Sequence, residues 1–244
     1  KDFVDYGYHK VTHILKQQGI IINKKKVYRL MKENKLLKPK KQKAVFKRNF
    51  IKYRKLKPVR PFQYLETDIK YIYVPSEKLN VYLLTIIDVF SRKVLGYKLA
   101  KSIKHKDLIQ LIDNFLSQYP NAKRITLRSD NGSQFIANKL KEHLILKGIY
   151  QEFTHFASPQ ENAHIEAYHS IIQREFIERI EYYTFSELSD LYEKYCNFYN
   201  SERIHSGIGF KAPNRYLLDW IKDDESCIDK DLLKLTLSTN FIKF

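Results

Sequence analysis

Acidic side chains at three separate places in the sequence could together bind metal ions. Asp130 follows the alternating segment 125–128, where a turn cluster begins at Ser129. Asp68 lies within an otherwise apolar and aromatic strand pattern, and a charge there is costly unless it is paired or binds a metal. Glu166 borders the apolar stripe of an expected helix, so its side chain could reach over a strand end. Carboxylates are the ligands that Mg²⁺ prefers.

Each carboxylate also has an ordinary structural interpretation or a rival. Asp130, in an Asp-Asn-Gly sequence, could simply cap the turn that it begins. Glu66 shares a strand face with Asp68 and could compete as a ligand. Asp88 lies on an expected hairpin, and we interpret it as tying the turn at 91–92.

Two histidines flank Glu166 on its helix, His164 and His169. A single helical histidine is commonly packed or solvated, and imidazole suits softer metals better than it suits Mg²⁺. We therefore interpret both as neighbours of the carboxylates rather than as metal ligands.

The elements that must position these residues form one α/β domain. Strand patterns of period two alternate with helical patterns, which predicts a mixed sheet covered by helices. The expected strands are 63–74, a hairpin over 81–100, 125–128 and 149–155, and the expected helices are 104–120, 137–148, 158–180 and 186–200.

The excess positive charge lies in the first quarter of the chain. Residues 1–60 hold 16 Lys and 4 Arg against 3 acidic residues, a net +17, whereas residues 61–244 hold 24 basic and 24 acidic residues. Such an imbalance favours a polyanionic partner, nucleic acid above all.

Two short helical patterns lie within this basic quarter. One runs over 8–19 and stops at Gly19, and the other begins after the N-cap residue Asn23. They indicate a helix-turn-helix, although a plain helical hairpin with a basic face stays open. The basic stretch that follows is interpreted as a linker that tracks phosphates. The predicted DNA contacts of the second helix are Lys24, Lys25, Lys26 and Arg29.

Other features of the chain limit its class. Cys196 and Cys227 provide no disulfide framework, which fits a reducing intracellular compartment. No apolar run approaches the length of a membrane span, and the start has no signal-peptide pattern. The first residue is not methionine, so we expect a fragment or a processed product.

Five motifs occur in a characteristic order, and 35 residues separate Asp130 from Glu166. Together they resemble a bacterial insertion-sequence transposase of the DDE type with a retroviral-integrase-like core, whose second reading frame is joined to the first by frameshifting. The resemblance covers residues 6–220. The motifs are TDIKYI, TIIDVFSRKVLGY, RSDNGSQF, SPQENAHIEAYHSIIQREF and YNSERIHSGIGFKAPNRY.

The resemblance implies a ribonuclease-H-like mixed sheet with helices on both faces, preceded by the small helical basic module. It implies that Asp68, Asp130 and Glu166 are the catalytic metal ligands, for two Mg²⁺ ions that Mn²⁺ can replace. The expected domains are a DNA-binding module over 1–40, a linker over 41–61, a catalytic core over 62–182 and a helical extension over 183–244.

The implied activity is cleavage at the ends of the element to free a 3′-OH, followed by strand transfer. The implied partners are double-stranded DNA and further copies of the chain, as a homodimer or a larger synaptic assembly, in the bacterial cytoplasm. Two alternatives stay open: a ribonuclease-H-like nuclease without strand transfer, and a catalytically silent DNA-binding regulator derived from a transposase.

The chain departs from the family pattern near the proposed metal ligands. Lys70 replaces a threonine that is frequent two residues after the first aspartate. Gln173 replaces a basic residue seven positions after Glu166, about 20° from it around the helix, while Arg174 is rotated about 80° away. Further predicted DNA contacts are Asn131, Asn162, Ser170, Gln173, Arg174, Arg203 and His205.

Overall fold

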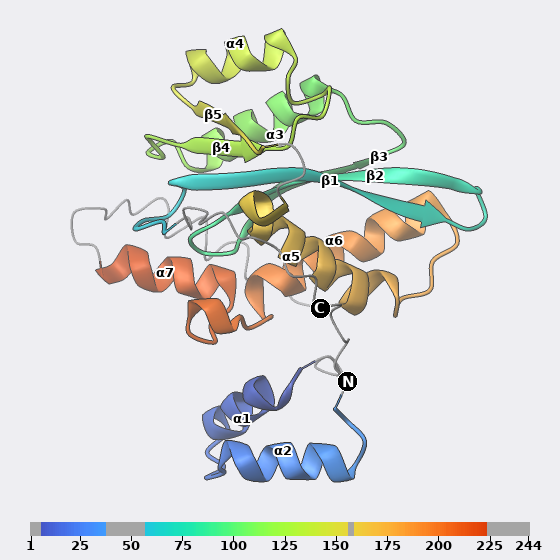
Figure 1. The fold of residues 1–244 in the computed structure, drawn as a ribbon, viewed down its shortest axis with the longest axis vertical. Helices are drawn as coiled ribbons and strands as arrows, with labels where there is room; N and C mark the ends of the chain where they lie inside the picture. The colour runs from blue at the N-terminus through green and yellow to red at the C-terminus, as the bar shows by residue number, and fades with distance from the viewer. Residues whose placement is uncertain (1–5, 38–56, 156–158, 224–244) are drawn as a thin grey trace.

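A computed structural model describes residues 6–37, 57–155 and 159–223. Its centre is a five-stranded sheet with the strand order β3-β2-β1-β4-β5 (Figure 1). The first three strands pair antiparallel, and β4 and β5 join them in parallel. The mixed sheet is therefore confirmed. Its strands are β1 (Tyr64–Val74), β2 (Leu79–Asp88), β3 (Val94–Ala100), β4 (Thr126–Ser129) and β5 (Tyr150–Phe153).

Helices cover both faces of the sheet. In Figure 1, α3 (His105–Gln118) and α4 (Asn138–Leu146) lie above it, and α5 (Ala163–Ile172) and α6 (Phe185–Ser201) lie below. One apolar cluster joins the sheet to α3 and α4 and takes in residues of α7 (Pro213–Asp223). A second cluster joins the other face to α5 and α6. These two layers hold the strand ends and α5 in fixed relation.

The hairpin between β2 and β3 turns where the sequence predicted. Arg92 adopts a left-handed backbone with φ 65°. The fully buried Asp88 carboxylate accepts hydrogen bonds from the Ser91 N–H (2.9 Å), the Ser91 hydroxyl (2.6 Å) and the Phe62 N–H (3.0 Å). Asp88 thus ties the turn, as its interpretation required.

The long helix expected over 158–180 is divided. A 3₁₀ turn (Pro159–Asn162) leads into α5, and a π-helical turn (Gln173–Ile177) follows it. The wider π turn places Phe176 in the second core cluster, while Glu175 reaches the Arg203 guanidinium at 2.6 Å. The residues of the π turn thus contact both the second core cluster and the segment after α6.

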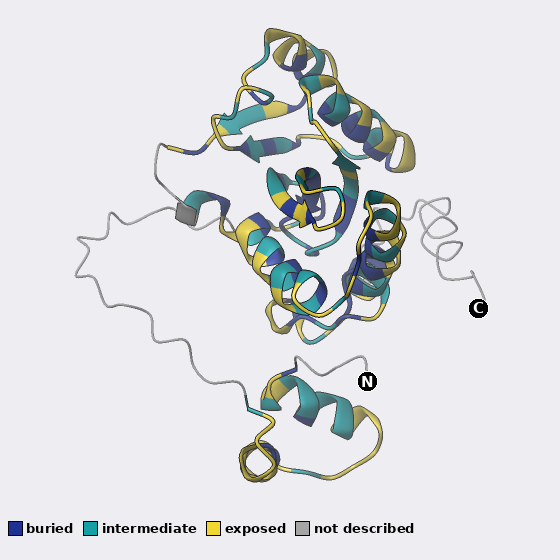
Figure 2. Ribbon diagram, turned by 90° about the vertical axis from the view of Figure 1, so that its right-hand side faces the viewer, coloured by how far each residue is buried: buried dark blue, intermediate teal, exposed yellow. Residues whose placement is uncertain are grey.

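The N-terminal module is a pair of helices, α1 (Tyr8–Gln17) and α2 (Lys24–Glu33). Gly19 adopts φ 81° after α1, and the Asn23 side chain caps α2 by accepting from the Lys25 N–H at 2.8 Å. Val27 and Met31 are buried, whereas much of the remaining α2 surface is exposed (Figure 2). Most of the predicted linker and the chain beyond residue 223 lie outside the described residues.

Among the described residues, contacts from Tyr6 and from α1 join the module to the rest of the chain. The hydroxyl of buried Tyr6, just before α1, accepts from the Ile204 N–H at 3.1 Å. The His13 ring stacks on Phe210, with 5.0 Å between ring centroids. Both partners belong to the segment after α6, so α1 rests on the C-terminal part of the core.

Candidate active site

Asp68 lies on β1, and Asp130 directly follows the end of the neighbouring strand β4. The parallel pairing of β1 with β4 ends at Glu66 opposite Arg128, and each aspartate comes two residues after that pair. Because side chains two residues apart point to the same face of a strand, both aspartates follow the same direction as the paired residues before them. β4 ends at Ser129, so Asp130 stands at its carboxyl end.

Glu166 approaches from α5, which packs on the same face. Burial raises the pKa of Glu166 above its usual range, and the negative charge of Asp68 raises it further. Burial also raises the pKa of Asp130; the Gly132 N–H opposes that rise, and the Asp68 charge adds to it. The structure thus brings the three predicted carboxylates into one electrostatic neighbourhood centred on Asp68.

Asp130 also performs the turn-capping role. Its Oδ1 accepts from the Gly132 N–H at 2.9 Å. A Cβ atom at Gly132 would stand 3.0 Å from that oxygen, so glycine keeps the space beside the carboxylate. The cap uses one oxygen of Asp130 and leaves the other free to act as a ligand.

His169 is a neighbour of Asp68. Its Nδ1 lies 3.4 Å from Asp68 Oδ2, and the two side chains are 12% and 25% exposed. Within the described residues, the Nε2 atom of His169 is buried without a hydrogen-bond partner. The described part of the chain contains no group of three His, Cys, Asp or Glu residues arranged to hold a metal ion.

Glu66 is buried rather than poised as a rival ligand. It is 1% exposed, and its Oε2 accepts from the N–H groups of His164 (3.0 Å) and Ile165 (2.8 Å) at the start of α5. Burial raises its pKa to about 7, against the opposing effect of these hydrogen bonds and of Arg128 and Arg92.

Sequence reasoning did not single out Arg128, which lies opposite Glu66. Its Nη1 donates to the Glu161 carbonyl at 2.6 Å, and its Nη2 lies 3.0 Å from Glu152 Oε2. The sequence does contain a signal for Arg128, because it precedes Asp130 by two residues at the end of an expected strand and its side chain should point to the same face.

The predicted DNA contacts near α5 differ in exposure. Ser170 and Arg174 are exposed, and Gln173 is half-buried with its Nε2 3.5 Å from Glu178 Oε1. Asn131 is exposed, and its amide donates to the Thr154 carbonyl at 2.8 Å.

Asn162, Arg203 and His205 require a correction, since their side chains do not face the solvent that DNA would displace. Asn162 is 5% exposed, Arg203 3% and His205 8%. Arg203 forms a two-point ion pair with Glu175, at 2.6 Å for both contacts, and its Nη1 lies 3.2 Å from the His205 ring nitrogens. Arg203 and His205, both of the YNSERIHSGIGFKAPNRY motif, therefore support the interior of the fold.

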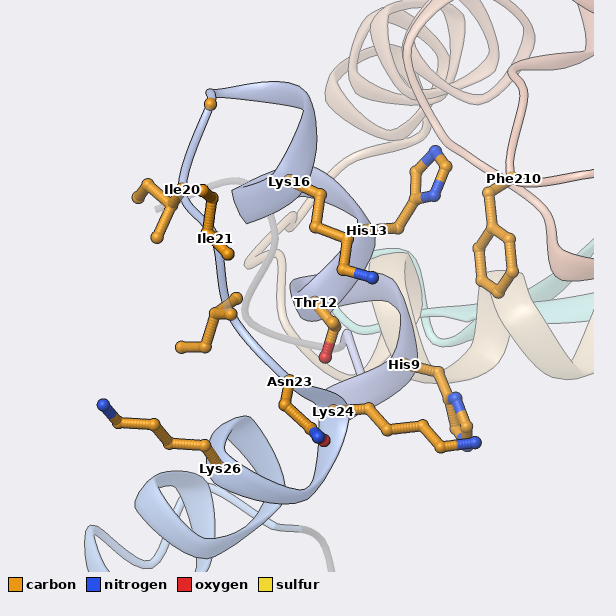
Figure 3. A pocket seen from close by; sticks show the side chains of 12 residues that line it. His9, Thr12, His13, Lys16, Ile20, Ile21, Asn23, Lys24, Lys26 and Phe210 are labelled. Carbon is orange, nitrogen blue, oxygen red and sulfur yellow. The ribbon is translucent and has the colours of Figure 1, made fainter.

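The predicted contacts of α2 lie on its surface, where Lys24, Lys25, Lys26 and Arg29 are all exposed. A hollow of about 1080 Å³ opens beside them, between the two helices and Phe210 (Figure 3). Lys16, Lys24 and Lys26 line it together with His9 and His13, so its border is cationic. None of its lining residues belongs to the carboxylate cluster. No helix in the described segments is long and apolar enough to cross a bilayer.

Comparison with known protein families identifies both the core and the N-terminal module. Residues 58–159 match the integrase core domain, residues 147–213 match a second integrase core domain family, and residues 2–44 match an HTH-like domain.

Two solved structures are similar in fold. The simian T-cell lymphotropic virus intasome in complex with the PP2A regulatory subunit B56 gamma has a TM-score of 0.54 at 13% identity, covering 66% of this chain and 56% of that chain. The HTLV-2 integrase catalytic core domain in complex with magnesium, in its trimeric form, has a TM-score of 0.51 at 15% identity, covering 66% and 99%. The core therefore has the ribonuclease-H-like integrase fold.

Relatives of known name are similar over most of the chain. The transposase for insertion sequence element IS904 of Lactococcus lactis is 28% identical over 225 residues, which cover 86% of this chain and 87% of that protein. The InsK protein of insertion sequence element IS150 of Escherichia coli is 30% identical over 234 residues, covering 86% and 77%. The chain belongs to the insertion-sequence transposases that combine an HTH-like domain with an integrase core.

Proposed function

We propose that this chain is a DNA transposase that cleaves and joins phosphodiester bonds at the ends of its insertion sequence, with Asp68, Asp130 and Glu166 as its catalytic metal ligands. One observation carries the assignment of these residues. Asp68 and Asp130 each come two residues after the paired Glu66 and Arg128, and Glu66 accepts from the N–H group of Ile165, the residue before Glu166, so three different elements of the fold direct these carboxylates toward one strand end. Membership of the transposase family supports the reaction class.

The residue types of the donor set suit divalent cations of the Mg²⁺ type, but the described residues contain no ready-made group of three such side chains, so the carboxylates would have to turn toward one another to hold the ions. Three carboxylates supply hard oxygen ligands, and Asp130 and Glu166 are exposed enough to admit water and substrate. Burial raises the pKa values of Asp130 and Glu166, the charge of Asp68 raises them further, and a cation held among the three would offset both effects. Two bound Mg²⁺ ions would neutralise charge on the attacking and leaving oxygens of an in-line displacement.

The proposed reaction has two displacements at phosphorus. Water attacks the phosphodiester at an element end, a P–O bond breaks, and a free 3′-OH and a 5′-phosphate result. That 3′-OH then attacks a second phosphodiester, forming one P–O bond while another breaks, so no external energy source is required. The carboxylates remain ligands throughout, and no bond forms between the chain and DNA.

We propose that the N-terminal module binds DNA. Exposed Lys24, Lys25, Lys26 and Arg29 on α2 would contact the element ends, while the basic linker adds phosphate contacts. We propose that the chain divides into four functional parts: a DNA-binding module over 1–40, a linker over 41–61, a catalytic core over 62–182 and a helical extension over 183–244. Pairing of two ends requires two or more copies of the chain, and the bacterial cytoplasm supplies the DNA.

The test is substitution of each carboxylate in the full chain. Asp68→Asn, Asp130→Asn and Glu166→Gln should each abolish cleavage of end duplexes in Mg²⁺ while duplex binding stays near that of the unsubstituted chain. Asp113→Asn is a matched control, because Asp113 lies on α3 and forms surface ion pairs with His143 and Lys147. It should cleave normally. Near-normal cleavage by any of the three carboxylate variants would overturn the assignment.

A further inference from the structure

Glu66 and Arg128 form a link between the sheet and the helix that carries Glu166. They are paired in register on adjacent parallel strands. Each stands two residues before one of the proposed metal ligands, Asp68 and Asp130, on the same side of its strand. The side chains of this pair therefore point toward α5 from just beneath the carboxylate cluster.

The start of α5 is held from the sheet rather than by its own cap residue. The N-cap residue Asn162 makes no side-chain capping hydrogen bond. Glu66 Oε2 instead accepts from the N–H groups of His164 at 3.0 Å and Ile165 at 2.8 Å. Those groups would otherwise have no partner within the helix, and a carboxylate there also suits the helix dipole.

Arg128 fixes the residues that lead into α5. Its Nη1 donates to the Glu161 carbonyl at 2.6 Å, in the 3₁₀ turn just before the helix. Its Nε and Nη2 contact Glu152 on β5 at 3.3 Å and 3.0 Å. The Arg128 guanidinium thus joins β5 to the 3₁₀ turn that leads into α5.

These contacts restrict the position of Glu166. It directly follows Ile165, whose N–H is held by Glu66, so its backbone has little freedom to move away from β1 and β4. A carboxylate that must share cations with Asp68 and Asp130 needs that restriction, because ligation fails with small displacements.

We propose that Glu66 and Arg128 are positioning residues that set the distance of Glu166 from Asp68 and Asp130 and thereby set the affinity for the metal ions. This inference rests on the proposed function. Neither side chain touches substrate or metal in this account, and both act through the backbone of the helix entry.

The experiment measures Mn²⁺ binding to the full chain, by electron paramagnetic resonance of the free ion, without DNA. Glu66→Ala removes the oxygen that accepts from both N–H groups and should weaken Mn²⁺ binding about tenfold or more, as loss of residues that orient ligands commonly does. Glu66→Gln keeps one acceptor oxygen and should fall between Glu66→Ala and the unsubstituted chain. Arg128→Lys cannot join Glu161 and Glu152 together and should also weaken binding.

Asp88→Asn is the matched control for lost stability. Asp88 is likewise a fully buried carboxylate that accepts backbone N–H groups, but it ties the β2–β3 turn instead of α5. It should lower the melting temperature and leave Mn²⁺ affinity unchanged. A similar loss of affinity in Asp88→Asn would mean that general loosening, not positioning, sets the affinity, and would overturn the inference.

Asp130→Asn separates the inference from the proposal beneath it. If Asp130→Asn binds Mn²⁺ as the unsubstituted chain does, the assigned metal site itself is wrong. If Asp130→Asn loses Mn²⁺ while a cooperatively melting Glu66→Gln and Arg128→Lys both bind it normally, the site stands and the positioning role is overturned. Should Glu66→Ala fail to fold, those two milder variants decide the matter.

Discussion

The Arg203 guanidinium donates a hydrogen bond to each carboxylate oxygen of Glu175, at 2.6 Å in both cases. The two side chains are only 4% and 11% exposed. Glu175 belongs to the π turn that continues α5, and Arg203 follows α6. The pair therefore joins the end of the Glu166 helix to the segment on which the N-terminal module rests.

Breaking this buried pair should cost stability rather than DNA affinity. Arg203→Ala leaves the Glu175 charge buried without its partner, so the free energy of unfolding should fall by about 3–5 kcal/mol. Chemical denaturation measures the loss. Lys211→Ala is the control, because its ion pair with Asp219 is 45% and 21% exposed and should contribute about 0–1 kcal/mol. Equal effects of the two substitutions would contradict the internal role of Arg203.

His205 should make the chain less stable in mild acid. Burial lowers its pKa to about 2, assisted by the positive charges of Arg203, Lys10 and Arg92, and the Tyr199 ring packs against it. The unfolded chain takes up a proton near pH 6.5, whereas the native chain does not until about pH 2. The contribution of His205 to stability should therefore fall with decreasing pH below 6.5, by about 1.4 kcal/mol per pH unit, while the raised pKa of Glu66 contributes with the opposite sign.

The measurement is unfolding of the unsubstituted chain and His205→Gln between pH 7 and pH 5. His205→Gln should show a shallower pH dependence, while His9→Gln, at an exposed position, should follow the unsubstituted chain. Parallel curves for His205→Gln and the unsubstituted chain would show that His205 is not held neutral.

Local patterns predicted much of this fold, and contacts distant in sequence account for most of what they missed. Asn23 caps α2, and Asp88 ties its turn through Ser91, because each of these contacts lies within a few positions in the sequence. The burial of Arg203 depends instead on Glu175, 28 residues earlier. Sequence alone gives no register for that pair, so a motif arginine in a basic protein was interpreted as a DNA contact.

The candidate site divides in the same way. Asp68 interrupts an apolar strand pattern, Asp130 begins a turn directly after a strand, and Glu166 borders the apolar stripe of a helix, while their grouping into one site comes from the family resemblance. The capping role of Glu66 requires knowledge that β1 and β4 pair in parallel with Glu66 opposite Arg128. Helical periodicity alone predicts a continuous α-helix at Gln173, whereas the structure has a π turn there whose Phe176 is buried in the second core cluster.

A positive charge introduced at Gln173 should contact a DNA phosphate. Gln173→Lys should strengthen binding to the element ends and steepen the salt dependence of log K by about 0.9, since one further phosphate contact releases its counterion. Gln110→Lys adds the same charge at an exposed site on α3, across the sheet, and should leave the slope unchanged. Identical slopes for Gln173→Lys and the unsubstituted chain would place this side chain away from DNA and favour Arg174.

Removing charge from α2 should have the opposite effect. Lys25→Ala and Lys26→Ala combined should weaken binding to the element ends and reduce the salt slope by up to about 1.8, if both contact phosphates. Lys139→Ala with Lys141→Ala on α4 removes the same charge from another exposed surface and serves as the control. A larger effect from the α4 pair would contradict recognition by the N-terminal module.

The central claim is that one carboxylate site performs both cleavage and joining, and pre-cleaved ends test it most directly. The full chain is mixed in Mg²⁺ with target plasmid and with end duplexes that carry either a 3′-OH or a 3′-deoxy terminus. The account predicts joined products with the 3′-OH ends alone, and none with Asp68→Asn, Asp130→Asn or Glu166→Gln. Joining by any of these three variants, or cleavage without any joining by the unsubstituted chain, would contradict it.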